Sequence, residues 1–233
     1  MIHPAQLIEE EATLVQQKRI KKESISVVFA KIAQFLSWPL FFIVFNLYFK
    51  IHIRGQENFS LAKRPFIVAA NHIRFYDCFL FRLALGFWTP HLPLRFMAVK
   101  KFDWTFLELA SKLGIIALVY KLFAVFTVEQ GQGIDKGLAT AREIIQAGEN
   151  IVMYPQGSIV TSDDLGPFKK GTVVLARDAN AEIVMVAFRI KKSSGLRNHL
   201  YIIVEKPFMI SPNLSAEEET RKLQAHLTYM YNA

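Results

Sequence analysis

Cysteine is nearly absent from this sequence of 233 residues, which contains only Cys78. A single cysteine excludes an internal disulfide bond and is typical of proteins that work in a reducing compartment. A secretory signal is also missing near Met1, because Glu9, Glu10 and Glu11 stand where a signal peptide has its apolar core. These absences predict a protein that stays in a reducing compartment.

Two common kinds of cofactor site are missing as well. The histidines other than His72 show no spacing typical of metal ligands, so we expect no metal site. The segment Gly131-Gln132-Gly133 lacks the third glycine of a dinucleotide-binding loop and does not directly follow a clean strand. The sequence therefore predicts no cofactor.

Apolar residues and positive charge are plentiful. Hydrophobic residues make up 52% of the chain, which includes 20 phenylalanines, and the formal net charge is +8. Either nucleic acid or an anionic membrane surface with anionic substrates explains such a charge. The densest basic run, residues 18–22, lies shortly before a long apolar segment, which favours lipid headgroups. We therefore expect membrane lipids and no nucleic acid as partners; a solvated basic helix face is the alternative.

The apolar segment between Lys31 and Lys50 contains no charged residue and is just long enough to span a membrane. Pro39, in its middle, favours a kink or a break in a helix. Basic residues lie on both sides, and a single span cannot place both flanks on the cytoplasmic side. We therefore predict that residues 5–50 form a bent helical hairpin in one leaflet, a monotopic attachment to the cytoplasmic face. A buried core helix is the alternative.

From residue 51 onward, short apolar runs alternate with stretches of helical spacing. Strands are expected at Ile51–Arg54, Phe66–Ala70, Phe96–Val99, Ala124–Val128, Ile151–Tyr154, Glu182–Ile190 and Leu200–Val204. Helices are expected at Cys78–Gly86, Thr105–Leu113, Gly133–Ala147, Gly171–Ala179 and from Ser215 to the end. This alternation predicts an α/β fold with a mainly parallel sheet flanked by helices, and sites in the loops at strand ends.

The segment Asn71–Asp77 directly follows the buried strand Phe66–Ala70 and precedes a helix. On one continuous helix, His72 and Asp77 would diverge by about 140 degrees. A strand–loop–helix turn instead allows the Asp77 carboxylate to accept a hydrogen bond from one imidazole nitrogen. It then supports the imidazolium that forms when the other nitrogen takes a proton. Without a serine, such a pair suits direct attack by an acceptor hydroxyl on a thioester.

Two later segments strengthen this hypothesis. Tyr154–Ser158 is a tight loop at a strand end, and Phe168–Thr172 opens a helix with two lysines. A helix N-terminus with free amides is an anion site, suited to a phosphate of the acyl carrier or of the acceptor. Taken alone, His72 reads as a structural histidine, and Lys169 and Lys170 as solvated surface lysines.

The order of these motifs resembles that of the glycerolipid acyltransferase family, which includes 1-acylglycerol-3-phosphate acyltransferase. The resemblance covers roughly residues 30–210 and rests on an Asn-His-x4-Asp motif, a Pro-x-Gly-Ser loop and a Phe-Lys-x-Gly motif. It implies His72 as general base and Asp77 as its orienting partner. It also implies an acyl-CoA or acyl-carrier-protein donor, a lysophospholipid acceptor, and an N-terminal helical hairpin at the membrane. We accordingly divide the chain into residues 1–50, the membrane helices, and 51–233, the α/β acyltransferase domain.

The expected substrate-binding residues lie in these motifs and beside them. They are Asn71, Arg74, Gln130, Pro155, Gln156, Gly157, Ser158, Phe168, Lys169, Lys170 and Gly171.

The sequence also departs from the pattern of the family it resembles. Gln130 stands where the family has an arginine for the acceptor phosphate, Gln156 replaces a glutamate, Ile159 replaces a second arginine and Met185 a proline. Loss of two arginines removes bidentate phosphate binding. We therefore hypothesise that the catalytic pair is retained and the acceptor altered, with Arg74 as a replacement cation. A catalytically silent lipid-binding relative is the competing interpretation.

Overall fold

The computed structural model describes residues 4–99, 112–128, 131, 133–160 and 165–233, with side chains from Ser26 onward. Its centre is a seven-stranded sheet in the order β1-β7-β6-β2-β5-β3-β4. The strands are β1 Phe49–Arg54, β2 Phe66–Ala70, β3 Leu94–Val99, β4 Val125–Val128, β5 Asn150–Met153, β6 Glu182–Lys191 and β7 Asn198–Val204. The predicted α/β class and mainly parallel sheet are confirmed, because β6 with β7 is the only antiparallel pair among the described strands.

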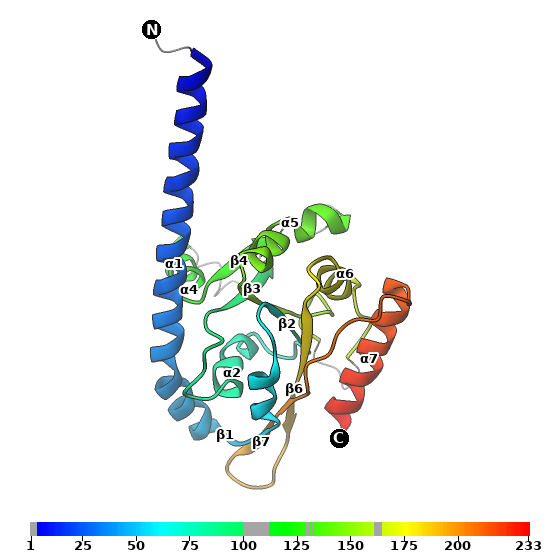
Figure 1. The fold of residues 1–233 in the computed structure, drawn as a ribbon. Coiled ribbons are helices and arrows are strands. Elements are labelled where there is room, and N and C mark those ends of the chain that lie inside the picture. The colour runs from blue at the N-terminus through cyan, green and yellow to red at the C-terminus, as the bar shows by residue number, and fades with distance from the viewer. Residues whose placement is uncertain (1–3, 100–111, 129–130, 132, 161–164) are drawn as a thin grey trace.

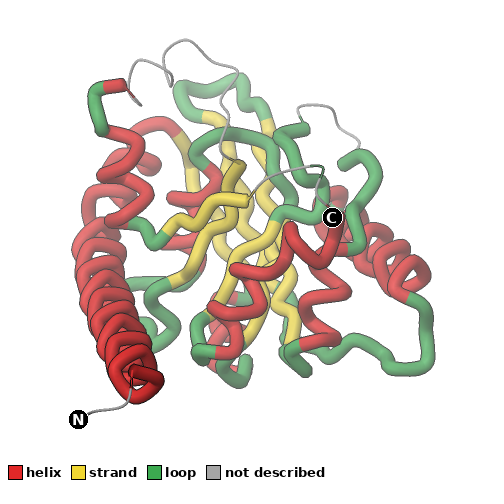
Figure 2. Tube along the Cα trace, turned by 90° about the horizontal axis from the view of Figure 1, so that it is seen from above, coloured by secondary structure: helices red, strands yellow, loops and turns green. Residues whose placement is uncertain are grey.

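Helices cover both faces of this sheet (Figures 1 and 2). The described helices are α1 Pro4–Tyr48, the 3-10 helix η1 Gln56–Leu61, α2 Asp77–Ala84, α4 Ile115–Leu122, α5 Gly133–Gln146, α6 Gly171–Asp178 and α7 Ala216–Asn232. The helix predicted over Thr105–Leu113 lies outside the described residues except for its last two. None of the predicted helices corresponds to α4, a short, strongly apolar helix that has no buried residue.

The central strand β2 shows how the core is divided. All five of its residues are fully buried, and successive side chains point to opposite faces. Val68 and Ala70 belong to the core that packs against α1 and α2, whereas Ile67 and Ala69 belong to the core under α5, α6 and α7. A strand covered on both sides reads as a continuous apolar run, which is why the sequence identified it.

The N-terminal segment differs from the predicted hairpin, because α1 is one continuous helix with Pro39 inside it. A hairpin needs a tight turn, and the chain has no glycine before Gly55. Pro39 removes only one backbone donor from the helix. Among the described helices, only α1 contains a segment long and apolar enough to cross a membrane, Ser26–Tyr48, and 11% of its apolar window is buried.

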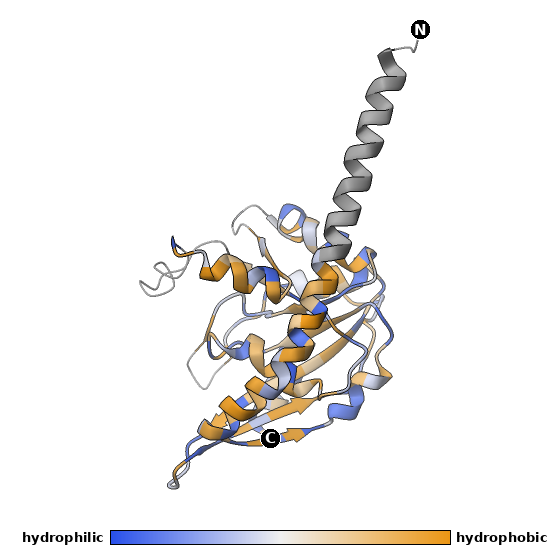
Figure 3. Ribbon diagram, turned by 90° about the vertical axis from the view of Figure 1, so that its left-hand side faces the viewer, coloured by the Kyte–Doolittle hydropathy of each residue, from blue (hydrophilic) through white to orange (hydrophobic). Residues whose placement is uncertain are grey.

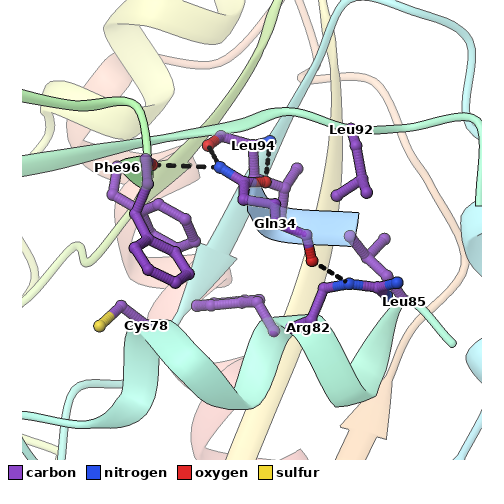
Figure 4. Close-up of a pocket in the computed structure, with 9 residues that line it drawn as sticks. Gln34, Cys78, Arg82, Leu85, Leu92, Leu94 and Phe96 are labelled. Atoms are coloured by element: carbon purple, nitrogen blue, oxygen red, sulfur yellow. Dashed lines mark hydrogen bonds between the residues drawn. The ribbon is translucent and has the colours of Figure 1, made fainter. Parts of the chain in front are cut away.

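A network of polar contacts joins α1 to the α/β domain (Figure 4). The Gln34 side chain on α1 donates to the Leu94 and Phe123 carbonyls and accepts from the Leu94 amide. Arg82 on α2, which is 4% exposed, donates from Nε to the Gln34 carbonyl at 2.6 Å. Desolvation lowers the pKa of Arg82 to about 10, so it remains charged at neutral pH. These contacts fix the direction in which α1 leaves the domain.

Candidate active site

The loop after β2 wraps around one carboxylate oxygen. Asp77, the first residue of α2, is fully buried, and its Oδ2 accepts three hydrogen bonds. The donors are His72 Nδ1 at 3.0 Å, the Ile73 amide at 2.7 Å and the Arg74 amide at 2.8 Å. Within the described residues, Oδ1 of the same carboxylate is buried without a partner. The carboxylate therefore fixes the loop backbone and the imidazole at the same time.

His72 is held so that one ring nitrogen faces outward. Because the carboxylate can only accept, Nδ1 carries the proton and Nε2 keeps its lone pair. The side chain is 19% exposed, so a substrate hydroxyl can approach it. The ring stacks on Tyr154 with centroids 4.0 Å apart and planes at 15°. The sequence prediction that His72 and Asp77 lie together in a strand–loop–helix turn thus matches the geometry.

Tyr154 was not among the expected site residues. It follows β5, whose register with β2 pairs Ala69 with Met153, so the next residue on each strand comes to the same sheet edge. Desolvation, followed by the charges of Cys78 and Asp77, raises the pKa of Tyr154 well above its ordinary value. The phenol therefore stays neutral and provides a ring surface for His72. Strand register was the missing signal, and the sequence does not supply it.

Gln156 connects the two loops of the site. Its Oε1 accepts a short hydrogen bond from the His72 amide, and its Nε2 donates to the Leu165 carbonyl at 2.9 Å. The Val160 amide donates to the His72 carbonyl at 2.8 Å, so the His72 backbone is held on both sides. Gln156 is 5% exposed. One acceptor and one donor are needed here, and an ionised glutamate has no donor.

Asn71 is also fully buried, with both amide atoms engaged. Its Nδ2 donates to the Phe188 carbonyl at 2.8 Å, and its Oδ1 accepts from the Phe188 amide at 2.7 Å. The backbone pairing of β2 with β6 ends at Ala70 and Val186. The Asn71 side chain extends this connection between the two strands. This placement favours a role in positioning the strand end over contact with substrate.

The segment that opens α6 lies against the tight loop after β5. The Lys169 amide donates to the Pro155 carbonyl at 2.7 Å, and the Lys169 side chain lies against Gly157. Gly157 has φ +74°, a left-handed conformation that L side chains rarely adopt. Ser158 is exposed nearby. Lys169 is therefore the lysine of the pair that the structure brings to this loop.

The other residues of the Phe-Lys-x-Gly motif have contacts elsewhere. Lys170 Nζ forms an ion pair with Glu217 Oε1 on α7 at 2.7 Å. The half-buried Phe168 packs in the core under α7, and Gly171 begins α6. Arg74 is exposed two residues from His72 and donates from Nη1 to the Ile73 carbonyl. Arg74 and Lys169 are thus cations in the loops that surround His72.

Three further residues or groups of residues bear on the chemistry of the site. Gln130 lies outside the described residues. Desolvation raises the pKa of Cys78 to about 12, and the adjacent Asp77 adds to the rise, so its thiol stays protonated and suits packing better than nucleophilic attack. Within the described part of the chain, no group of three or more His, Cys, Asp or Glu residues could hold a metal ion.

Comparison with known proteins identifies the family. The family model described as Acyltransferase matches residues 50–189, the stretch that contains both loops around His72. The chain belongs to the Acyltransferase family.

Curated relatives carry more specific names. The chain is 23% identical over 185 residues to the chloroplastic 1-acyl-sn-glycerol-3-phosphate acyltransferase BAT2 of Brassica napus, covering 76% of this chain and 50% of that protein. It is 26% identical over 146 residues to a probable 1-acyl-sn-glycerol-3-phosphate acyltransferase of Mycoplasma genitalium, covering 60% of this chain and 51% of that one. The chain therefore spans about half the length of these relatives.

A solved structure has the same fold. The crystal structure of the 1-acyl-sn-glycerophosphate (LPA) acyltransferase PlsC from Thermotoga maritima aligns with a TM-score of 0.53 and 18% identity. The alignment covers 97% of this chain and 86% of that one. At this identity, the likeness establishes the arrangement of the elements.

Proposed function

We propose that the protein is a membrane-associated O-acyltransferase. It moves a fatty acyl group from an acyl thioester to the hydroxyl of a lysophospholipid, with 1-acylglycerol-3-phosphate as the first acceptor to test. The observation that carries the proposal is the bond of 3.0 Å from His72 Nδ1 to the buried Asp77 carboxylate. The names of the curated relatives support the choice of acceptor.

The reaction follows from the state of the imidazole. Nε2 takes the proton of the acceptor hydroxyl as its oxygen attacks the thioester carbonyl. The Asp77 carboxylate stabilises the imidazolium, which then returns the proton to the thiolate that leaves as the tetrahedral intermediate collapses. An ester forms, a thioester breaks, and no cofactor is consumed. Acyl-CoA and acyl-carrier protein are both suitable donors for this step.

The altered motifs bear on the acceptor. Ile159 carries no charge and Gln156 is used to hold the backbone of His72. Within the described parts of the loops around His72, the cations are Arg74 and Lys169, which we assign to the acceptor headgroup. A lysolipid with a different headgroup, or another lipid alcohol, is the acceptor to test next.

Membrane attachment rests on one face of α1. Many of its large apolar side chains from residue 28 to residue 48 are exposed, and α4, which contacts α1, also exposes large apolar side chains. Figure 3 shows this stretch of α1 as mostly hydrophobic. The exposed residues on α1 include Phe29, Leu36, Leu40, Ile43 and Leu47. Such a surface is stable in lipid and unstable in water. We therefore propose monotopic attachment through α1 to the cytoplasmic face of a membrane.

Release of free thiol from acyl-CoA, or of free carrier protein, tests the activity directly. Full-length protein in detergent is offered a panel of lysolipids and lipid alcohols together with each donor. We expect His72→Ala to lower turnover by about 10³-fold or more, because the general base is lost. His226→Ala, at an exposed position on α7, is the matched control and keeps turnover. Lipid binding without turnover on any acceptor would instead indicate a silent lipid-binding relative.

A further inference from the structure

A basic and aromatic surface lies on the sheet face opposite α1. Strand register places its side chains in two rows across β1, β7 and β6. The first row is Lys50, His199 and Lys191, and the second is His52, Tyr201 and Arg189. They point to the same face as Ile203 and Ala187, which pack in the core under α7. None of them belongs to the site around His72.

The C-terminal end of α7 lies beside this surface. Arg189 Nη1 donates to the Asn232 carbonyl in the last turn of the helix at 3.1 Å, so α7 ends beside the second row. The result is a cleft of about 350 Å³. Its lining residues are His52, Ile53, Arg54, Arg189, Lys191, Tyr201, Ile203 and Ala233. A concave site of this volume is of the size that binds small molecules.

Three aromatic rings lie parallel beside the cleft. His52 Nε2 and His199 Nδ1 are 2.9 Å apart, and their ring planes differ by 4°. The Tyr201 ring lies 4.7 Å from that of His52, with planes at 15°. Parallel rings of this kind offer a face on which a planar ligand can stack.

The side chains around these rings carry positive charge. Among the described residues, no carboxylate side chain forms an ion pair with Lys50, Arg54, Arg189 or Lys191. Desolvation, together with His52, Lys50 and Lys191, lowers the pKa of His199. Clustered cations without counter-ions favour a ligand with several negative charges. Phosphate groups fit, because lysine and arginine both bind them well.

We propose that this cleft binds a water-soluble ligand of the adenine-nucleotide class, with a planar ring and at least two phosphate groups. Because the cleft and the exposed apolar side chains of α1 lie on opposite faces of the sheet, a soluble ligand fits better than a lipid headgroup. Coenzyme A contains such a nucleotide. In naming it as the acyl carrier, the inference rests on the proposed function.

One strand links the cleft to the catalytic loop. Phe188 on β6 is bonded through its backbone to Asn71, the residue before His72. Arg189 follows Phe188, and Lys191 lies three residues after Phe188, about 10 Å along the strand. A nucleotide in the cleft therefore lies at the sheet edge that bears His72. A flexible pantetheine arm connects the two positions around the end of β6.

The test is the affinity of the full-length protein in detergent for free coenzyme A, measured by isothermal titration calorimetry. We expect the double variant Arg54→Gln/Lys191→Gln to weaken binding by about tenfold or more, because two phosphate-pairing cations are lost. The double variant Lys136→Gln/Lys222→Gln removes the same charge from exposed positions on α5 and α7 and should stay within about twofold of the unmodified protein. Equal affinities in the two double variants would overturn the proposal.

The histidine pair adds a second readout. Desolvation and the neighbouring cations favour the neutral imidazole of His199, and a bound phosphate opposes this, so binding takes up a proton and tightens as the pH falls from about 7.5 to about 6. His199→Gln should flatten this dependence. A pH dependence unchanged in His199→Gln would contradict the assigned ligand position.

Further arms separate the inference from the proposed function. Anionic vesicles and acyl-carrier protein are tested with both double variants, and a loss confined to either of these probes would assign the cleft to another partner. His72→Ala should abolish turnover and leave the affinity for coenzyme A unchanged. If the cleft variant loses coenzyme A binding and no acceptor is acylated, the site stands and the acyltransferase proposal fails. If turnover depends on His72 and the cleft variant binds coenzyme A normally, the acyltransferase proposal stands and the cleft proposal fails.

Discussion

At the scale of single residues, the site depends on one oxygen atom. Asp77 Oδ2 serves the His72 ring and two loop amides together. A side chain that orients an imidazole and also holds its loop cannot be exchanged for an isosteric amide without effect. An amide in its place offers a weaker acceptor and brings a donor that favours the wrong imidazole tautomer.

We expect Asp77→Asn to lower kcat by about 10³-fold while the protein stays folded, because the imidazolium loses its counter-charge. Thiol release at saturating substrate measures the effect, and circular dichroism monitors the fold. His226→Ala again serves as the control. A loss of less than about tenfold would show that Asp77 only shapes the loop.

A second prediction concerns Gln156, because its side-chain amide both accepts and donates a hydrogen bond. In Gln156→Glu, an ionised carboxylate faces the Leu165 carbonyl without a proton to share. We expect a loss of about 1–3 kcal/mol in the free energy of unfolding at pH 7. Protonation restores a donor at low pH, so the difference from the unmodified protein should shrink as the pH falls.

Denaturant unfolding of the unmodified protein and the variant at about pH 7 and about pH 5 measures both effects. Ser158→Ala, in the same loop but exposed, is the matched control. A penalty that grows as the pH falls would contradict the donor assigned to Gln156.

The same residue scale shows what sequence can predict about a site. His72 and Asp77 lie on one short loop, so their pairing followed from the order of strand, loop and helix. The contacts of His72 with Gln156 and Tyr154 cross more than eighty positions of sequence. They depend on the pairing of β2 with β5, which no local pattern encodes.

At the scale of elements, the buried strands and the helices α5, α6 and α7 were predictable, whereas α4 and the continuous course of α1 were not. The run Phe66–Ala70 is uniformly apolar because both of its faces are covered. In α1, the basic residues on both flanks suggested a hairpin, whereas the absence of glycine before Gly55 permits one continuous helix. Flanking charge describes the preferred surroundings of a helix end, and only turn-forming residues specify a turn.

The exposed face of α1 gives the prediction at this scale. Leu36 and Leu40 are 66% and 59% exposed, one helical turn apart. Leu36→Glu/Leu40→Glu should lower binding to lipid vesicles by about tenfold or more, because charged side chains are costly in the apolar part of a bilayer. Co-sedimentation with vesicles measures this.

Leu196→Glu, in the exposed turn between β6 and β7, is the matched control and should keep vesicle binding. Thermal unfolding should be similar in all three proteins, because none of these leucines is buried. Unchanged vesicle binding in the α1 variant would place the membrane contact elsewhere.

At the scale of the whole molecule, the sheet contains strands that run in two opposite directions. β1 and β7 run together, antiparallel to the five strands from β6 to β4. Sequence alternation predicted parallel strands and gave no sign of this reversal, because a connection's length and composition do not reveal its path. The reversal brings β1, which follows α1 directly, beside the strands that line the basic cleft.

The placement of the catalytic pair on one short loop also affects how such a protein can change. In the proposed mechanism, proton transfer depends on residues 71–77, whereas the neighbouring loop from residue 154 to residue 160 and the start of α6 come from a separate stretch of chain. Among the described residues, the links between them are the hydrogen bonds of Gln156 and Val160 to the His72 backbone and the stacking of Tyr154 on the His72 ring. Exposed positions such as Ser158 and Ile159 do not make these contacts with His72. A lineage of such proteins can therefore acquire new acceptors by substitution in one loop and inherit the acyl-transfer chemistry intact.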